Sequence, residues 1–442
     1  MREVIVIGAG ISGLSVAYHL TRKGIDTLVL EKEEKPGGNI QTLIKDRYIL
    51  ELGPQTIMAD SAVEEFLKDL GLEPQYASES SKLRYIYKKG KLIPLPLSPL
   101  SFFTSPLLSF GAKLRVLKEP FVPPSPKTEE SVAEFVKRRL GQEFLDYIVA
   151  PFLSGVYAGD PRELSVKYAV RRVYELEQRF GSLIKGAIKL RALGPKGKLI
   201  SFDGGNYTLI EELAKKVNIE TENVALRIRR KDELFHIDTK KGKYTAKAVV
   251  VAVPASSAGY LLRDLSWSAS EEFERIYYAP VVVVHVAVKK GYVPPGFGFL
   301  VPRVEGKRTL GVLFSSQLFP GRAPQDMDLL TVYLGGATDP EVIDYEEDAI
   351  QSIVEKELRE MLKVERLEFL NITRWKRAIP QYTLGYGKYL ELAQTFEREN
   401  PGLFLTGNHL FGISVADCIR ASYSVVKRVE EFIRQTTPNS VR

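Results

Sequence analysis

The feature that most restricts the fold of this chain is a glycine cluster close to its N-terminus. Val4 to Ile7 is a short apolar strand, and Gly8-Ala-Gly10-Ile-Ser-Gly13 follows it at the start of a segment with helical spacing, Ile11 to Lys23. A second strand, Thr27 to Leu30, completes one βαβ unit. Glycines at this spacing permit a tight turn, the approach of a pyrophosphate and close helix packing. The cluster therefore predicts an α/β fold with a Rossmann-type dinucleotide site.

Further residues specify which dinucleotide this site holds. Glu31 ends the second strand, where its carboxylate can accept hydrogen bonds from ribose hydroxyls and would repel the 2'-phosphate of NADP. Pro36-Gly37-Gly38-Asn39 lets the backbone approach a long, extended dinucleotide a second time. Near the C-terminus, Gly407-Asn408 and Gly412-Ile-Ser-Val415 place another helix N-terminus beside an apolar strand. These features favour FAD over NAD.

Composition limits the class of protein. The chain has 442 residues, 44% of them hydrophobic and 26% charged, which predicts several compact globular units. Its net charge of +7 suits an anionic ligand, an acidic lipid surface or nucleic acid, and does not choose among them. Cys418 is the one cysteine, which excludes an intramolecular disulfide and favours the cytoplasm. The four histidines are scattered, so we predict no metal site.

An uncharged stretch interrupts the chain between Leu92 and Ala112. It is long enough to span a bilayer, but its four prolines argue against a continuous helix. Basic residues follow at Lys113, Arg115 and Lys118, a pattern that suits a monotopic membrane contact. The same pattern suits a loop that packs between domains, and the sequence leaves both interpretations open.

The remainder alternates between helical and strand patterns. Ser131 to Leu190 is helical, and we predict three later helices, Thr208 to Lys216, Glu347 to Leu362 and Val415 to Arg434. We predict further strands at Asn223 to Arg229, Leu234 to Thr239, Lys247 to Val253, Val281 to Val288, Thr309 to Ser315, Leu329 to Leu334 and Leu403 to Thr406.

Seven longer stretches carry a resemblance to a known family. They are Glu51-Leu-Gly-Pro54, Arg84-Tyr-Ile-Tyr87, Gly155-Val-Tyr-Ala-Gly-Asp-Pro161, Arg179-Phe-Gly-Ser182, Gly296-Phe-Gly-Phe-Leu-Val-Pro302, Trp375 with Ile379-Pro-Gln-Tyr382, and Gly407 to Cys418. By these stretches the sequence resembles the oxygen-dependent protoporphyrinogen oxidases of the flavin amine oxidase superfamily. The resemblance implies a segmented FAD-binding domain (1–82, 200–256 and 396–442), a mixed-sheet substrate domain (83–91 and 257–395) and a helical membrane-binding insertion (92–199).

The resemblance also implies site residues. Those at the non-covalent FAD would be Gly8, Ala9, Gly10, Ile11, Ser12, Gly13, Glu31, Lys32, Gly38, Asn39, Gly53, Pro54, Gln55, Thr56, Val224 through its backbone, Trp375, Gly407, Ile413, Ser414 and Val415. Arg84 would bind a substrate propionate, because a guanidinium grips a carboxylate with two hydrogen bonds. The carbonyl of Gly155 would face the tetrapyrrole. The apolar wall around the macrocycle would comprise Phe297, Gly298, Leu300, Phe314 and Tyr333.

The reaction implied by the resemblance removes six hydrogens from protoporphyrinogen IX in three two-electron steps. Hydride would pass to flavin N5, so no protein residue is assigned as catalytic acid or base. O2 or another acceptor, such as a quinone, would reoxidise the flavin. Alternatives are oxidation of coproporphyrinogen III, a flavin amine oxidase, and a non-catalytic lipid-carrying module.

The expected setting follows from the same resemblance. We expect a cytoplasmic protein that binds the cytoplasmic membrane peripherally through residues 92–118, and no nucleic-acid partner. The resemblance allows a homodimer, but the sequence does not fix the oligomeric state.

Overall fold

The βαβ unit at the N-terminus forms as the sequence predicts. In the computed structural model, β1 (Arg2–Ile7) and β2 (Thr27–Leu30) pair in parallel, and α1 (Ile11–Arg22) begins directly after the glycine turn. The structure describes residues 1–190 and 197–436. The parts of the expected insertion and C-terminal segment at 191–196 and 437–442 lie outside the described residues.

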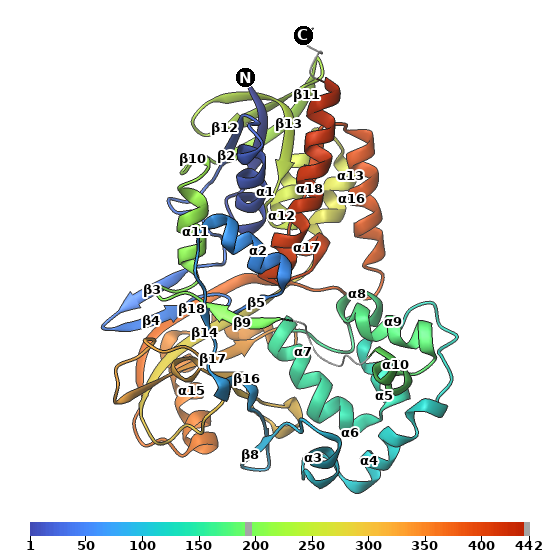
Figure 1. Ribbon diagram of the computed structural model, residues 1–442, viewed down its shortest axis with the longest axis vertical. Coiled ribbons are helices and arrows are strands. Elements are labelled where there is room, and N and C mark those ends of the chain that lie inside the picture. Colours follow the sequence, from blue (N-terminus) through green and yellow to red (C-terminus); the bar gives the residue numbers. More distant parts are fainter. Residues whose placement is uncertain (191–196, 437–442) are drawn as a thin grey trace.

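Seven strands build the first sheet from three distant parts of the chain (Figure 1). Its order is β10-β2-β1-β13-β12-β11, with β19 also beside β13. The remaining bounds are β10 (Asn218–Glu220), β11 (Ala225–Lys231), β12 (Leu234–Thr239), β13 (Lys243–Val251) and β19 (Leu403–Leu405). β1, β2, β10, β13 and β19 run parallel, so their carboxyl ends share one edge of the sheet.

Helices cover both faces of this sheet, which explains why its central strands are continuously apolar. One face packs against α1, α2 (Ser61–Leu70), α11 (Tyr207–Ala214) and α18 (Val415–Thr436). The other packs against α12 (Ala255–Leu262), α13 (Trp267–Glu274) and α16 (Gly387–Glu399). These last three helices lie almost wholly within 257–395, the segment expected to build the substrate domain. Their apolar contacts are with the first sheet instead.

The second sheet is mixed and also has seven strands, ordered β18-β14-β17-β16-β15-β7-β8. Their bounds are β7 (Arg84–Lys88), β8 (Lys91–Pro94), β14 (Tyr278–Lys289), β15 (Gly298–Leu300), β16 (Thr309–Phe314), β17 (Met327–Gly335) and β18 (Glu368–Pro380). α15 (Glu347–Leu362) covers one face through a core of valines and leucines. The other face is turned toward α7 (Ala150–Tyr157) and the chain at Glu51 and Leu52.

Two small sheets and a helical region complete the chain. The small sheets are β3 (Thr42–Lys45) with β4 (Tyr48–Glu51), and β5 (Ile57–Ala59) with β9 (Lys198–Ser201) and β6 (Gln75–Tyr76). The remaining helices are α3 (Pro99–Thr104), α4 (Phe110–Leu117), α5 (Val132–Arg139), α6 (Gln142–Phe144), α8 (Val166–Ala169), α9 (Arg171–Phe180), α10 (Leu183–Leu190), α14 (Ser315–Leu318) and α17 (Asn408–Phe411). The predicted helical segment after Ser131 is confirmed.

The uncharged stretch from Leu92 to Ala112 begins in β8 and continues as a helical hairpin, whose two short helices, α3 and α4, each begin at a serine cap. Within 1–190 and 197–436, no helix has both the length and the apolar character needed to cross a bilayer. The predicted basic margin of this stretch is wrong for Lys113. Lys113 is buried and donates to the carbonyls of Phe103 and Ser105, because it closes the turn between the helices. Lys118 remains exposed.

One of the strands that the sequence did not predict is β18, the long edge strand of the second sheet. Its residues alternate poorly between apolar and polar, and two irregularities interrupt its register with β14. An edge strand with bulges has no continuous buried face, so a period-two pattern is absent from its sequence.

Buried histidines predict how stability depends on pH. Burial lowers the pKa of His285 and His409 from 6.5 to about 4. The unfolded chain therefore binds protons below pH 6.5, whereas the folded chain binds them only below about pH 4. We expect the free energy of unfolding to fall as pH falls through this window, by about 2 kcal/mol per histidine between pH 7 and 5.

Urea unfolding at several pH values measures this slope. His285→Gln should flatten it by one histidine's share, whatever its effect on stability at pH 7. Equal slopes for the variant and the parent would contradict the prediction.

Candidate functional site

Three glycines of the first turn have different physical reasons to be glycine. Gly8 has φ +104°, and a Cβ there would lie 2.6 Å from the carbonyl oxygen of Ala252. A Cβ on Gly13 would lie 2.0 Å from the carbonyl oxygen of Gly8. Gly10 has an ordinary φ of −73°, and no atom lies within 4 Å of its missing Cβ. The protein itself does not require glycine at position 10, so the open space there fits an external group such as a pyrophosphate.

Glu31 is locked against this turn. Its carboxylate accepts hydrogen bonds from the backbone N–H of Ala9 at 2.7 Å and of Glu33 at 2.9 Å. Each oxygen keeps a further lone pair that can accept a ribose hydroxyl. The N–H of Gly37 donates to the Ala9 carbonyl at 2.8 Å, so the second glycine pair lies alongside the first.

The adenine end of the predicted site lies next to Glu31. The backbone N–H of Asn223 donates to the Glu31 carbonyl at 2.8 Å, and Val224 follows directly. The Val224 carbonyl accepts a hydrogen bond from the backbone of Lys240. Lys32 is another residue predicted at the cofactor. Its side chain is 68% exposed, and its ammonium pairs with Glu33.

A second helix N-terminus meets the first. α18 begins at Val415, where the Ser414 hydroxyl and the Asp417 carboxylate cap one another's backbone N–H groups. One residue further, Cys418 contacts Ser12 of α1 through its side chain. Both helix dipoles therefore present positive ends to the same region, which favours a phosphate group. Burial raises the pKa of Cys418 to about 11, so its thiol is protonated and unsuited to a covalent flavin link.

The segment from Leu52 to Thr56 joins this region to the second sheet. A Cβ on Gly53 would lie 1.9 Å from the carbonyl oxygen of Asn39, so the two backbones touch. The Trp375 indole N–H donates to the Leu52 carbonyl at 2.6 Å, and the Asn39 amide donates to the Ala378 carbonyl at 3.3 Å. The sequence-predicted residues at the middle of the FAD site are thus brought together.

Register places the predicted substrate residues on the face of the second sheet that is not covered by α15. Arg84 is opposite Gly298, Leu300 is opposite Gly311, and Gly311 is opposite Tyr333. Because directly paired residues share a face, Arg84, Gly298, Leu300 and Tyr333 all point the same way.

Phe314 does not belong to this group. It lies three residues after Gly311 on β16 and therefore points to the opposite face. There it is fully buried beneath α15, with its ring 5.9 Å from that of Phe299. Phe314 therefore belongs to the core beneath α15 and not to the predicted substrate wall.

Arg84 is a cation without an anionic partner among the described residues. Its guanidinium lies 4.5 Å from the centre of the Phe297 ring, and within the described residues it makes no ion pair or side-chain hydrogen bond. Burial lowers the pKa of Arg84, because the charge is partly removed from water without a counter-charge. A carboxylate ligand would supply both the missing charge and the missing acceptors.

α7 brings Gly155 against the same face. A Cβ on Gly155 would lie 2.7 Å from a methyl group of Leu300, so a larger residue would push the helix away from the sheet. Phe152 and Val156, one helical turn before and one residue after Gly155, are 49% and 40% exposed. Neither residue was predicted from the sequence to lie at this face. Their apolar i, i+4 spacing was the available signal, but exposure cannot be read from it.

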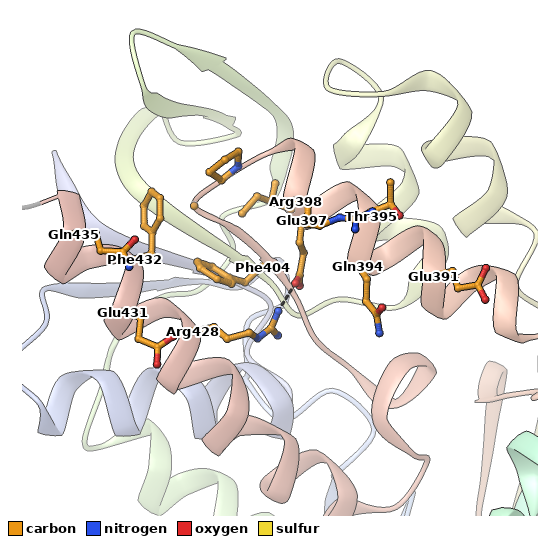
Figure 2. A pocket seen from close by; sticks show the side chains of 13 residues that line it. Glu391, Gln394, Thr395, Glu397, Arg398, Phe404, Arg428, Glu431, Phe432 and Gln435 are labelled. Atoms are coloured by element: carbon orange, nitrogen blue, oxygen red, sulfur yellow. Dashed lines mark hydrogen bonds and ion pairs between the residues drawn. The ribbon is translucent and has the colours of Figure 1, made fainter.

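A separate groove lies on the outside of the molecule, between α16, β19 and α18 (Figure 2). The Arg428–Glu397 ion pair crosses it, and Phe404 and Phe432 line it. Arg428 lies thirteen residues along α18 from Val415, about 20 Å from the helix N-terminus. The groove is therefore remote from the predicted flavin site.

The fold and the site together define a flavoprotein oxidoreductase. The family described as flavin containing amine oxidoreductase matches residues 11–429, and the chain belongs to that family. FAD is its cofactor, and when bound it supplies the redox chemistry.

Individual relatives are more specific. The chain is 34% identical to protoporphyrinogen oxidase 1, chloroplastic, of Spinacia oleracea, over 98% of this chain and 85% of the relative. It is 27% identical to coproporphyrinogen III oxidase of Bacillus subtilis (strain 168), over 95% and 96%. A crystal structure from Exiguobacterium sp. 255-15, provisionally named a protoporphyrinogen oxidase, superposes with a TM-score of 0.83 at 23% identity, covering 97% and 99%.

The contrast among the glycines gives a test of the cofactor site. Gly10→Ala places a methyl group in space that the protein leaves open, so we expect an unchanged apoprotein melting temperature. FAD affinity should fall at least about tenfold, equivalent to about 1.4 kcal/mol. Isothermal titration of the apoprotein with FAD measures this.

Gly111→Ala is the matched control, because its Cβ also meets nothing within 4 Å and it lies in α4, in the helical region. It should leave FAD affinity unchanged. If Gly10→Ala lost apoprotein stability but retained FAD affinity, position 10 would be glycine for a purely structural reason.

Proposed function

We propose that this chain oxidises a porphyrinogen, with FAD as hydride acceptor, and that protoporphyrinogen IX is the preferred substrate. The observation that carries the proposal is Arg84, a partly buried guanidinium that lies beside an apolar sheet face and has no ion-pair partner in the described part of the chain. Such a face suits a large apolar macrocycle, and the cation suits its propionate. The names of the plant and bacterial relatives agree with a porphyrinogen.

Coproporphyrinogen III is the alternative substrate, because it has the same ring system and more carboxylates. Lys88 lies on the same strand face as Arg84, but its ammonium already donates to the Leu107 carbonyl and approaches Glu143 at 3.5 Å. Arg84 is therefore the cation of β7 that is available to substrate. A single available cation on β7 favours the less carboxylated porphyrinogen.

The protein's proposed role in this reaction is to hold and orient the substrate, because neither His285 nor Tyr333 on this face offers an acid or base near neutrality. His285 shares the face with Tyr333 but is fully buried, and its ring N–H donates to the Glu51 carbonyl. Burial raises the pKa of Tyr333 and keeps its hydroxyl protonated. We therefore assign no catalytic acid or base. Bound FAD would accept the hydride at N5, and O2 is the proposed final acceptor.

The proposed site residues follow from this arrangement. The proposed cofactor set is the one that the family resemblance implies. We propose that these residues hold FAD without a covalent bond. The proposed substrate set is Arg84, Gly155, Phe297, Gly298, Leu300 and Tyr333, extended by Phe152 and Val156 on α7. The proposed three-part division of the chain keeps its expected limits, except that α12, α13 and α16 join the FAD-binding part.

Anaerobic reduction of the bound flavin tests cofactor and substrate together. We expect protoporphyrinogen IX to bleach the yellow flavin spectrum faster than coproporphyrinogen III does. Faster reduction by coproporphyrinogen III would reverse the preference. A purified protein that shows no flavin spectrum after FAD has been offered would overturn the enzyme proposal in favour of a binding module.

Arg84→Ala tests the propionate contact. We expect KM for protoporphyrinogen IX to rise at least about tenfold, since a charge-assisted hydrogen bond contributes about 1.5 to 3 kcal/mol. Steady-state kinetics measure it, and Lys82→Ala is the control because that side chain is 70% exposed two residues away. An unchanged KM in Arg84→Ala would remove the residue from the site.

We also propose that the α3–α4 hairpin attaches the protein to the cytoplasmic face of a membrane. Its outward side chains are large and apolar: Leu100 is 76% exposed, Phe110 is 74% exposed, and Phe121 shortly after α4 is 86% exposed. Exposed apolar residues gathered in one short segment indicate an interaction surface, and Lys118 would face anionic headgroups.

Replacing Leu100, Phe110 and Phe121 together with serine should move the protein from the membrane pellet to the supernatant after cell lysis. The change removes apolar area that would enter the acyl region. The control replaces Tyr260 and Trp267, two large residues on α12 and α13 that are 50% and 61% exposed, and should leave the distribution unchanged. A triple variant that still pellets would exclude the hairpin as the anchor.

A further inference from the structure

A buried ion pair at the edge of the proposed flavin site joins β4, in one of the small sheets, to the loop that leads into β17 of the second sheet. Arg322, in the loop between α14 and β17, donates to the Glu51 carboxylate at 2.8 Å, and the two side chains are 3% and 4% exposed. The backbone N–H of Asn206 and the Thr42 hydroxyl also donate to Glu51, each at 2.8 Å. Arg322 donates further to Ser201 and to the Phe202 carbonyl. Every charge is matched, although burying such a pair is energetically costly.

The segment that follows Glu51 is held by its carbonyls. The Glu51 carbonyl accepts from His285 at 3.0 Å, the Leu52 carbonyl from Trp375 at 2.6 Å, and the Pro54 carbonyl from Asn206 at 2.7 Å. Two of these three donors belong to the second sheet. The Glu51 to Thr56 segment is therefore attached to the second sheet although it contributes to the cofactor site.

Gln55 extends the attachment toward the proposed substrate face. Its amide N–H donates to the Glu51 carbonyl at 2.6 Å. Its amide oxygen accepts from Ser315 at 3.4 Å and from Thr331 at 3.3 Å, and Tyr333 contacts Gln55 through its side chain. One residue of the cofactor site thus contacts one residue of the proposed substrate wall.

We propose that Arg322 is a positioning residue for hydride transfer. By holding Glu51 it fixes the Gly53 to Thr56 segment against the second sheet, and thereby sets the distance between the flavin and the porphyrinogen. Arg322 itself touches neither molecule. This inference rests on the proposed function, because it presumes that the second sheet binds the hydride donor.

The consequence is a specific kinetic signature. Hydride transfer needs the reacting atoms within about 3 to 3.5 Å, and a displacement of about 1 Å costs about a hundredfold in rate. Arg84 and the apolar wall stay in place when Arg322 is changed, so substrate binding should change much less than the transfer rate.

The test compares Arg322→Met, Arg322→Lys and the parent enzyme, each purified with FAD. Stopped-flow reduction of the flavin by protoporphyrinogen IX under anaerobic conditions gives the transfer rate, and steady-state kinetics give KM. We expect Arg322→Met to transfer hydride at least about thirtyfold more slowly, with KM changed less than about threefold. The flavin absorbance peaks should shift, and Arg322→Lys should recover part of the rate because it restores a charge.

Arg139→Met is the matched control. Arg139 and Glu119 form an ion pair with 0% exposure of both side chains, in the helical region away from the flavin segment. This variant should lose stability but keep the parent's transfer rate and flavin spectrum.

The outcomes separate the inference from the proposed function. If neither porphyrinogen reduces the parent flavin, although dithionite does, the proposed function fails. If the parent is reduced and Arg322→Met is reduced at the same rate, the positioning role fails. A rise in KM without a change in transfer rate would also overturn it. If Arg322→Met does not fold, Arg322→Lys alone must show the slowed rate, and a parental rate there overturns the inference.

Discussion

The structure depends on one constraint: a cofactor site on one sheet and a proposed substrate face on another must meet at a fixed distance. The meeting point is the short segment after Glu51, and its attachment is polar. A buried carboxylate is tolerated only when its charge and lone pairs are satisfied, and Arg322, Thr42 and Asn206 satisfy those of Glu51. Apolar contacts alone would hold this segment against the second sheet without fixing its position along the sheet. Directional hydrogen bonds hold the segment and also fix its position.

The dinucleotide turn shows how one motif combines structural and ligand-directed positions. Gly8 and Gly13 are glycine because backbone atoms occupy the space of a side chain. Gly10 is glycine although the protein leaves that space open. The three glycines are equivalent in the sequence motif, and only the surrounding atoms distinguish the position that the fold itself leaves open.

The substrate face shows where sequence reasoning reaches its limit. Arg84 could be singled out only through the resemblance, since one arginine among many cations carries no local signal. The resemblance implies that Phe314 and Tyr333 share one apolar wall, yet the register of β16 and β17 turns them to opposite faces. A shift of one residue in a strand reverses every side chain, so register decides membership of a site. Phe152 and Val156 were missed for a related reason, because exposure depends on what packs beside a helix.

The sequence by itself determined the βαβ unit, the acidic residue at its second strand, most of the buried strands and the helix from Glu347 to Leu362. These depend on local periodicity and on glycines within one turn, which are physical signals carried by adjacent residues. Tertiary structure alone decided the face on which each apolar strand residue lies, the burial of Lys113 and the pairing of Glu51 with Arg322 across 271 residues of chain. No local pattern encodes such a partner, because it is selected by the way that distant segments pack together in the folded chain.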